Sequence, residues 1–206
     1  MYLDILKDRL YTSPARSVER RSAQTVLYTL LDVLSRLIAP ILPMTAEEIW
    51  RHMPAVPNRA ASVHFTRLPA PDPGWMDPAL AERWEGLLRV RSEVTKALEE
   101  ARAKKLIGHA LDASVTLSAD GALYEALAPY AAELRSLFIV SEVVLLKDTP
   151  LPDAFESAEV KGLKIRVGPA EGKKCERCWV YDTTVGAYTE HPTICGRCRS
   201  ALEEAV

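Results

Sequence analysis

The sequence predicts a mainly α-helical protein with a small α+β module and a terminal segment that a metal ion holds together. Apolar residues recur at helical spacing in the first half, β-rich runs appear only in the second half, and all four cysteines lie near the end. The chain has 206 residues, 48% of them hydrophobic, which suffices for one or two domains. We expect a helical bundle over 1–109, an α+β domain over 110–170 and a zinc-binding knuckle over 171–206.

The helical part opens with a stripe of apolar residues over 20–38, spaced three and four apart as on one face of a helix. The prolines that follow would end this helix. Thr45 and Glu48 match a capping box, in which a hydroxyl and a carboxylate satisfy free amides at a helix N-terminus. This pattern predicts that a second helix starts at Thr45.

A proline-rich stretch over 54–78 lacks any sustained period and is expected to be a loop. A long helix should follow over 78–107, because Asp77 suits the N-cap and an apolar stripe runs through the segment until Gly108 ends it.

Beyond Gly108 the pattern changes to short runs typical of strands. These are ASVTLS (113–118), SEVVLL (141–146) and LKIRVGP (163–169), with a helix expected over 121–138 between the first two. The region therefore reads as a small α+β domain.

Cys175, Cys178, Cys195 and Cys198 form two C-x-x-C pairs separated by sixteen residues. This spacing is typical of a structural zinc site, in which four thiolates surround one Zn²⁺ and leave no position for a reacting water. Two disulfides or a redox pair are the alternatives, and each needs a context that the rest of the sequence does not provide. His191 could replace a thiol but reads more simply as a loop residue.

Between the two pairs, a hairpin is expected with its turn at 182–184. Cationic residues surround the cysteines, and flat aromatic residues lie among them. The residues concerned are Lys173, Lys174, Arg177, Arg197 and Arg199, with Trp179 and Tyr181. Such a combination binds single-stranded nucleic acid by phosphate contact and base stacking. The alternative is that Trp179 and Tyr181 only cover the metal module, and spacing alone does not separate the two.

Nothing in the sequence resembles an active site. A glycine-rich phosphate loop, G-x-S-x-G and H-E-x-x-H are all missing, and the histidines are scattered. The net charge of −2 argues against a uniformly basic surface. No apolar run approaches the length of a membrane span and the first residues do not look like a signal peptide, so we expect an intracellular protein without a membrane partner.

Several stretches together resemble the C-terminal region of bacterial isoleucyl-tRNA synthetases, which are class I aminoacyl-tRNA synthetases. They are DILKDRLYT, ERRSAQTVLYTLLDVLSRLIAPILPMTAEEIW, IGHALDASVTL, ELRSLFIVS and KCERCWVY…HPTICGRC. The resemblance implies a class I anticodon-binding helical bundle, a small junction domain and a zinc knuckle that reaches the anticodon loop. By the family's motif, Arg177 and Trp179 would contact anticodon bases, with Lys173, Lys174, Arg197 and Arg199 as weaker candidates.

The same resemblance implies that the chain is a fragment of a cytoplasmic enzyme that attaches isoleucine to its tRNA using ATP. The HIGH-like and KMSKS-like nucleotide motifs of the catalytic core are not in these residues, so the fragment should be inactive alone, with no catalytic residue of its own. Its partners would be the anticodon arm of tRNA(Ile) and the remainder of the synthetase. Two other hypotheses stay open: a DNA-binding knuckle of a repair protein, and a zinc module that only braces neighbouring domains.

Overall fold

The structure, a computed structural model, describes residues 1–204 and divides into two compact units. Unit 1 comprises Met1–Pro14 and the chain from Asp77 onward, and unit 2 comprises Ala15–Met76. The expected domain boundaries at 109/110 and 170/171 remain a prediction. Within the described residues, no helix is both long enough and apolar enough to cross a membrane.

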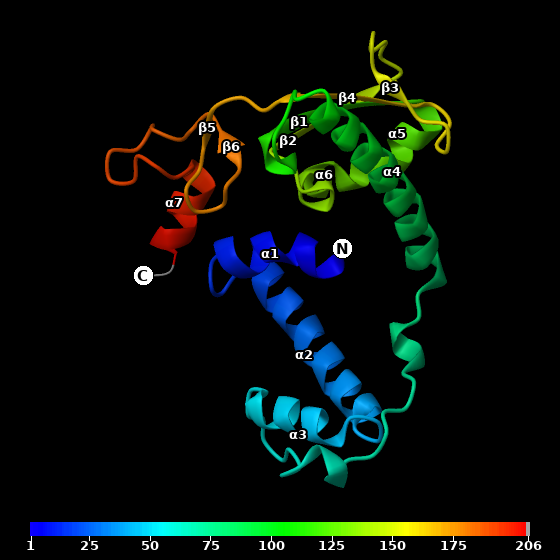
Figure 1. Ribbon diagram of the computed structural model, residues 1–206, viewed down its shortest axis with the longest axis vertical. Coiled ribbons are helices and arrows are strands. Elements are labelled where there is room, and N and C mark those ends of the chain that lie inside the picture. The colour runs from blue at the N-terminus through cyan, green and yellow to red at the C-terminus, as the bar shows by residue number, and fades with distance from the viewer. Residues whose placement is uncertain (205–206) are drawn as a thin grey trace. The chain divides into compact units, whose positions relative to one another are not determined.

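Unit 2 consists of two helices and a long connection (Figure 1). The first, α2 (Val18–Ile38), has Ser17 as its N-cap, whose hydroxyl accepts from the Arg20 amide at 3.3 Å. The second, α3, spans Pro43–His52. The predicted capping box at Thr45 is wrong, because α3 starts two residues earlier with Leu42 as N-cap and Pro43 in the first turn. Proline fits there because its fixed φ is already helical and its missing N–H has no partner to lose.

The core of unit 2 is a small apolar cluster. It comprises Ala39, Ala46, Trp50, Met53 and Val63. The indole N–H of Trp50 donates to the Ala60 carbonyl at 2.9 Å, and the Arg59 guanidinium lies 4.0 Å from the Trp50 ring centroid. The connection after α3 contains only the short 3₁₀ turns η1 (Val63–Phe65) and η2 (Pro73–Trp75). It is held to α3 through the Trp50 side chain.

Unit 1 contains the helices α1 (Tyr2–Thr12) and α4 (Pro78–Ala103), the latter capped by Asp77, which accepts from the Leu80 amide at 2.9 Å. The prediction that Gly108 ends α4 is wrong. Lys105 adopts a left-handed conformation with φ 60°, and the Leu106 amide bonds the Ala101 carbonyl at 3.0 Å. This pattern closes the last turn as a Schellman motif, and lysine here takes the position that glycine usually holds.

A four-stranded sheet occupies the middle of unit 1, in the order β2-β1-β4-β3. The strands are β1 (Ala113–Ala119), β2 (Glu142–Lys147), β3 (Phe155–Glu156) and β4 (Leu163–Pro169). A 3₁₀ turn, η3 (Ala110–Asp112), leads into β1. β1 runs parallel to β2 and antiparallel to β4, and β3 is antiparallel to β4. Parallel neighbours need a crossover, which here consists of α5 (Gly121–Leu127), η4 (Ala128–Tyr130) and α6 (Ala131–Phe138). The three strands predicted from sequence are confirmed; the helix predicted between the first two is interrupted around Pro129.

Side chains of α4, α6 and the sheet form one apolar core, in which Val94, Leu117, Leu134 and Ile165 are buried. One carboxylate, Glu93, is buried with them. Its oxygens accept from Lys96 at 2.6 Å and from the Ser157 hydroxyl at 2.7 Å, so the buried charge is paired.

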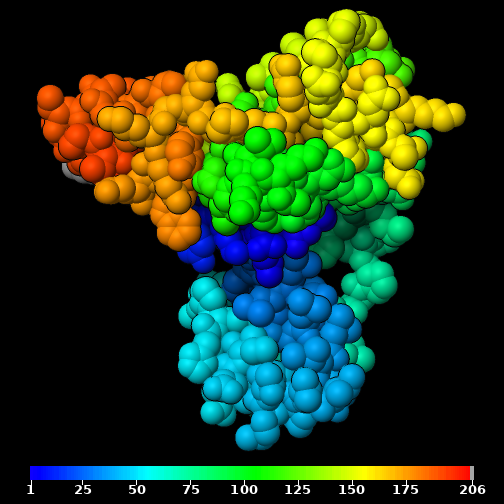
Figure 2. All heavy atoms as spheres, turned by 45° about the horizontal axis from the view of Figure 1, so that its top comes forward, coloured from blue at the N-terminus to red at the C-terminus, as the bar shows by residue number. Residues whose placement is uncertain are grey.

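The terminal segment of unit 1 contains β5 (Lys173–Lys174), β6 (Tyr181–Asp182) and α7 (Gly196–Glu203). The predicted hairpin with its turn at 182–184 is wrong, because β6 pairs with β5 and the hairpin loop is the first cysteine pair itself. Figure 2 shows this segment, in orange and red, directly beside the green residues of the sheet region. The Ser141 hydroxyl joins them by accepting from the Tyr181 amide at 2.8 Å.

Candidate metal centre and nucleic-acid interface

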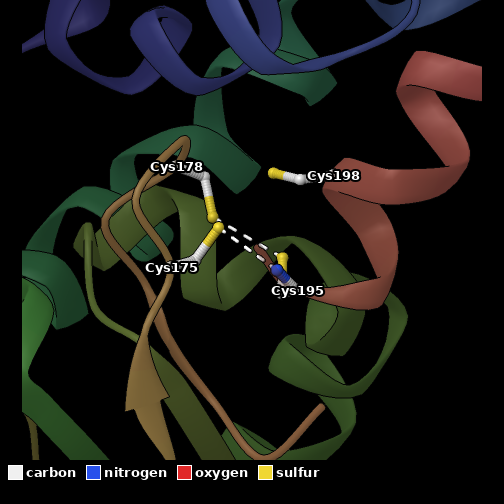
Figure 3. A group of neighbouring side chains, drawn as sticks. All are labelled: Cys175, Cys178, Cys195 and Cys198. Atoms are coloured by element: carbon white, nitrogen blue, oxygen red, sulfur yellow. Dashed lines mark hydrogen bonds between the residues drawn. The ribbon is translucent and has the colours of Figure 1, made fainter. Parts of the chain in front are cut away.

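The two cysteine pairs meet in the terminal segment. Their four sulfur atoms all lie within 4.8 Å of one another, and Cys175, Cys195 and Cys198 are buried. In Figure 3 the sulfurs of Cys175 and Cys178, from the loop between β5 and β6, point toward those of Cys195 and Cys198 at the start of α7. All four thiols are free of disulfides.

Tight backbone turns place these sulfurs. In the first pair, the Trp179 amide donates to the Cys175 carbonyl at 2.8 Å, and Trp179 adopts a left-handed φ of 65° that closes the turn. In the second, Cys195 is the N-cap of α7, so Cys198 follows on the first helical turn. The Cys195 amide donates to the Cys175 sulfur at 3.3 Å. An amide aimed at sulfur stabilises thiolate charge, as structural zinc sites require.

Glycine is required where β5 begins. Gly172 has φ +90°, and a Cβ there would lie 2.4 Å from the Asp182 carbonyl carbon. Only glycine lets the backbone come this close to β6.

The geometry fits a tetrahedral ion. Zinc–sulfur bonds of ~2.3 Å imply sulfur–sulfur edges of about 3.8 Å. The sulfurs of Cys178 and Cys195 are 3.8 Å apart. His191 is exposed and is not among the clustered ligands, so the described residues offer four sulfur donors at this point and no imidazole. A four-thiolate shell suits zinc in a structural role.

The pKa values of Cys178, Cys195 and Cys198 are shifted in different directions. A hydrogen bond from Cys198 lowers the pKa of Cys178 to about 4, against the opposing effect of burial, with the Val180 amide and Arg197 assisting. The same bond, together with burial, raises the pKa of Cys198, and burial raises the pKa of Cys195. A metal ion would have to displace the protons of Cys195 and Cys198, which couples binding to proton release.

Two of the predicted RNA-binding arginines are bonded to α1. Arg177 donates to the carbonyl of Thr12 at 2.6 Å and to that of Tyr11 at 3.4 Å. Arg197 makes a two-pronged ion pair with the carboxylate of Asp8, at 2.6 and 2.8 Å. The structure therefore engages both side chains inside unit 1.

The other predicted residues are more accessible. Trp179 is 61% exposed, and the Lys174 ammonium lies 5.8 Å from its ring centroid. Arg199 stacks on Tyr188 with 4.5 Å to the ring centroid and pairs with Glu203 at 2.8 Å. Lys173 is exposed, and Tyr181 is half-buried in β6 beside the first cysteine pair. Trp179 is thus the aromatic side chain of the first cysteine loop that is free to stack on a base.

A pocket of about 520 Å³ opens next to Trp179. Its walls come from α1, from the end of α6 and from the first cysteine loop, and they include Ile5, Tyr11, Arg135, Ile139, Val180 and Trp179 itself. Ile139 and Trp179 both have left-handed φ values, 58° and 65°. Branched and bulky residues seldom adopt this conformation, and such outliers gather at binding sites.

Sequence reasoning missed the role of α1. Asp8, Tyr11 and Thr12 are spaced three and four apart, so one face of α1 presents them together. Their partners lie 165 or more residues later in the chain. An aspartate on a short amphipathic helix carries no local signal for such a distant contact.

Comparison with known families identifies the class of protein that has these helices, paired thiols and an accessible aromatic side chain. The profile of the family described as an anticodon-binding domain of tRNA ligase matches residues 1–117, more than half of the chain. The chain belongs to this family. A second profile, described as a zinc finger found in FPG and IleRS, matches residues 172–201, which include all four cysteines.

Relatives along the whole chain are isoleucine–tRNA ligases. The chain is 51% identical over 204 residues to the isoleucine–tRNA ligase of Syntrophotalea carbinolica, and 48% identical over 203 residues to that of Geobacter sulfurreducens. It is 49% identical over 203 residues to that of Desulforamulus reducens. Each comparison covers 98% of this chain but 22% of the relative, so the chain spans about a fifth of the length of these proteins.

Proposed function

We propose that this chain recognises the anticodon stem and loop of isoleucine tRNA as part of an isoleucine–tRNA ligase. Ligation of isoleucine with ATP would belong to parts of such an enzyme that these residues do not include. The similarity to isoleucine–tRNA ligases over 98% of the chain supports this assignment over a DNA-repair knuckle. The observation that carries it is Trp179, an exposed aromatic beside a lysine on a rigid cysteine turn.

In this proposal the four cysteines, Cys175, Cys178, Cys195 and Cys198, hold one structural Zn²⁺. The metal would do no chemistry. It would fix the turn that displays Trp179, whose indole stacks on an unpaired base of the loop, while Lys173, Lys174 and Arg199 contact phosphates. Arg177 and Arg197 are weaker as direct contacts, since both are bonded to α1. They would bring the end of α1 to the RNA together with Trp179.

The test is a titration of the chain with the isoleucine tRNA anticodon arm at fixed salt. Trp179→Ala should cost about 1–3 kcal/mol of binding free energy, the value of one lost base stack. His191→Ala, which removes an exposed ring from the same segment, is the matched control and should bind like the parent.

Two competitors separate the remaining hypotheses. An arm with an exchanged anticodon should bind more weakly, whereas duplex DNA of equal length should not compete effectively. Equal affinity for both anticodons would contradict anticodon recognition. Preference for duplex DNA would favour the repair hypothesis, and no salt-dependent affinity for any nucleic acid would favour a purely bracing module.

A further inference from the structure

The end of α1 and the cysteine turns are joined by two arginines from the terminal segment. After Thr12 the backbone becomes extended at Ser13, so the last carbonyls of α1 lack helical partners. Arg177 supplies donors to two of them, those of Tyr11 and Thr12. A guanidinium at this position also meets the negative end of the helix dipole. Arg177 therefore caps α1 from a distant part of the chain.

The second arginine holds the side of the same helix. Arg197 donates to both carboxylate oxygens of Asp8, and Asp8 also accepts from the Thr12 hydroxyl at 2.8 Å. Two parallel charge-assisted bonds fix orientation as well as distance. Asp8 is half-buried, so solvent screens this pair less than an ordinary surface pair.

Each of these arginines lies inside one of the two cysteine pairs. Arg177 belongs to the first C-x-x-C turn and Arg197 to the second. The turn that places each pair of sulfurs therefore also places the arginine that bonds α1. The cysteine cluster and α1 are connected twice, through one side chain from each pair.

The charges favour this arrangement when a metal is bound. Zn²⁺ with four thiolates carries a net charge of about −2, so both arginines face an anionic centre. An ion shared by all four sulfurs would also hold the two turns, and with them the two arginines, at a fixed separation. The contact of the arginines with α1 should therefore depend on whether the cysteines ligate a metal.

We propose that Arg177 and Arg197 form a clasp that couples zinc binding by the four cysteines to the docking of α1 on the terminal segment. Arg197 acts as a positioning residue, with Asp8 as its anchor on α1. The inference rests on the proposed zinc site and not on RNA binding. It has one structural consequence: α1 and the cysteine loop are two walls of the pocket beside Trp179, so the clasp sets the width of that pocket.

The first experiment measures zinc affinity of the 206-residue chain, without RNA, by competition with a chromophoric chelator. Residues that orient metal ligands typically change affinity by 10- to 100-fold, and we expect a loss in this range, roughly, for Arg197→Gln. Asp8→Asn, which leaves every group near the sulfurs in place, should weaken zinc by at least about 5-fold. Arg197→Lys should recover part of the loss because the charge is retained.

Two matched controls isolate the clasp. Asp4→Asn removes a carboxylate from α1 that pairs with Lys7 and with the N-terminus. Arg102→Gln removes a surface arginine from α4 that pairs with Glu99. Both should leave zinc affinity unchanged. In the Arg197→Gln background, Asp8→Asn should have no further effect, since the two act through one contact.

The second experiment tests the reverse direction. Coupling between two equilibria is reciprocal, so removing zinc should speed hydrogen exchange of the α1 amides if docking of α1 strengthens zinc binding. In Asp8→Asn, zinc removal should speed this exchange less than in the parent, because only the Arg177 contact remains to couple the two. Full zinc occupancy at saturating metal shows that each variant still folds its site.

The coupling is overturned if Asp8→Asn and Asp4→Asn both bind zinc with an affinity within twofold of that of the parent chain. The coupling is also overturned if removing zinc from the parent chain leaves the hydrogen-exchange rates of the α1 amides unchanged. Neither result concerns RNA affinity, so the clasp can fail while anticodon recognition stands, and the reverse is equally possible.

Discussion

The terminal segment and unit 2 are both too small to bury much apolar surface, and they are stabilised in different ways. The buried cluster of the terminal segment consists of Cys175, Cys195 and Cys198 with Ile194. That of unit 2 consists of aliphatic side chains around the indole of Trp50. One region depends on sulfur donors and charged contacts, whereas the other depends on ordinary packing.

Because the two regions are stabilised differently, they should respond to different perturbations. Metal binding is nearly all of the folding free energy of a small metal-held module, since its ligands are scattered without the ion. In unit 2 the corresponding free energy comes from apolar area and shape. A treatment that disrupts one region should therefore leave the other intact.

Removal of zinc should have the largest effect. Structural zinc in small fingers binds with roughly 10–16 kcal/mol, so chelation or Cys195→Ser should abolish hydrogen-exchange protection across the terminal segment. The amides of α3 should keep theirs. Ser200→Ala, on the exposed face of α7, is the control and should behave like the parent. Protection of residues 173–198 that survives chelation would show that the segment folds without metal.

Truncation of Trp50 should have the next largest effect, confined to unit 2. The side chain is 5% exposed and its N–H is bonded to Ala60, so Trp50→Ala should cost about 3–5 kcal/mol of unfolding free energy. Trp75 belongs to the same unit and is 65% exposed, so Trp75→Ala should change stability by no more than about 0.5 kcal/mol. Denaturant unfolding followed by circular dichroism measures both.

Zinc stoichiometry decides whether the two regions are independent. It should be unchanged in Trp50→Ala. Loss of zinc in this variant would mean that the apolar core of unit 2 also supports the metal site.

The contrast also explains what sequence could and could not predict. The α2 helix and the cysteine cluster could be predicted because each follows from the spacing of residues that are close together in the sequence. The clasp does not, because Asp8 and Arg197 are 189 residues apart and neither is unusual locally. The position of the hairpin could not be predicted for the same reason. The pairing of Lys174 with Tyr181 depends on how the cysteines close their loop, not on turn residues at 182–184.

Acid should weaken unit 2 through Glu47. A hydrogen bond from the Ser62 hydroxyl, opposed by burial and assisted by Arg51 and the Val63 amide, holds the pKa of Glu47 below its ordinary value of 4.5. A lowered folded-state pKa gives stability that is present above the unfolded value and lost as pH falls through the folded one. The unfolding free energy of unit 2 should therefore decline below about pH 4.5, and Glu47→Gln should flatten this decline.

The acid titration has an internal comparison. Glu48 is the neighbouring acid on α3. Among the described contacts, its side chain makes none with the connection after α3, whereas Glu47 accepts from Ser62 there. Glu48→Gln should keep the decline seen in the parent. A decline of equal depth in Glu47→Gln would assign the acid sensitivity to other carboxylates.

The smallest effect is expected on the apolar stripe of α2, whose side chains are largely uncovered. Val26, Leu30, Leu34 and Leu37 are each more than 40% exposed, although the sequence pattern places apolar residues there as on a core-facing helix. Two helices and a loop cannot cover such a stripe, because the apolar cluster of unit 2 lies around α3. Leu34→Gln should thus change the unfolding free energy by about 0.5 kcal/mol or less, against the several kcal/mol of Trp50→Ala. A loss above about 2 kcal/mol would show that Leu34 is packed in solution, and would make α2 as dependent on apolar burial as α3.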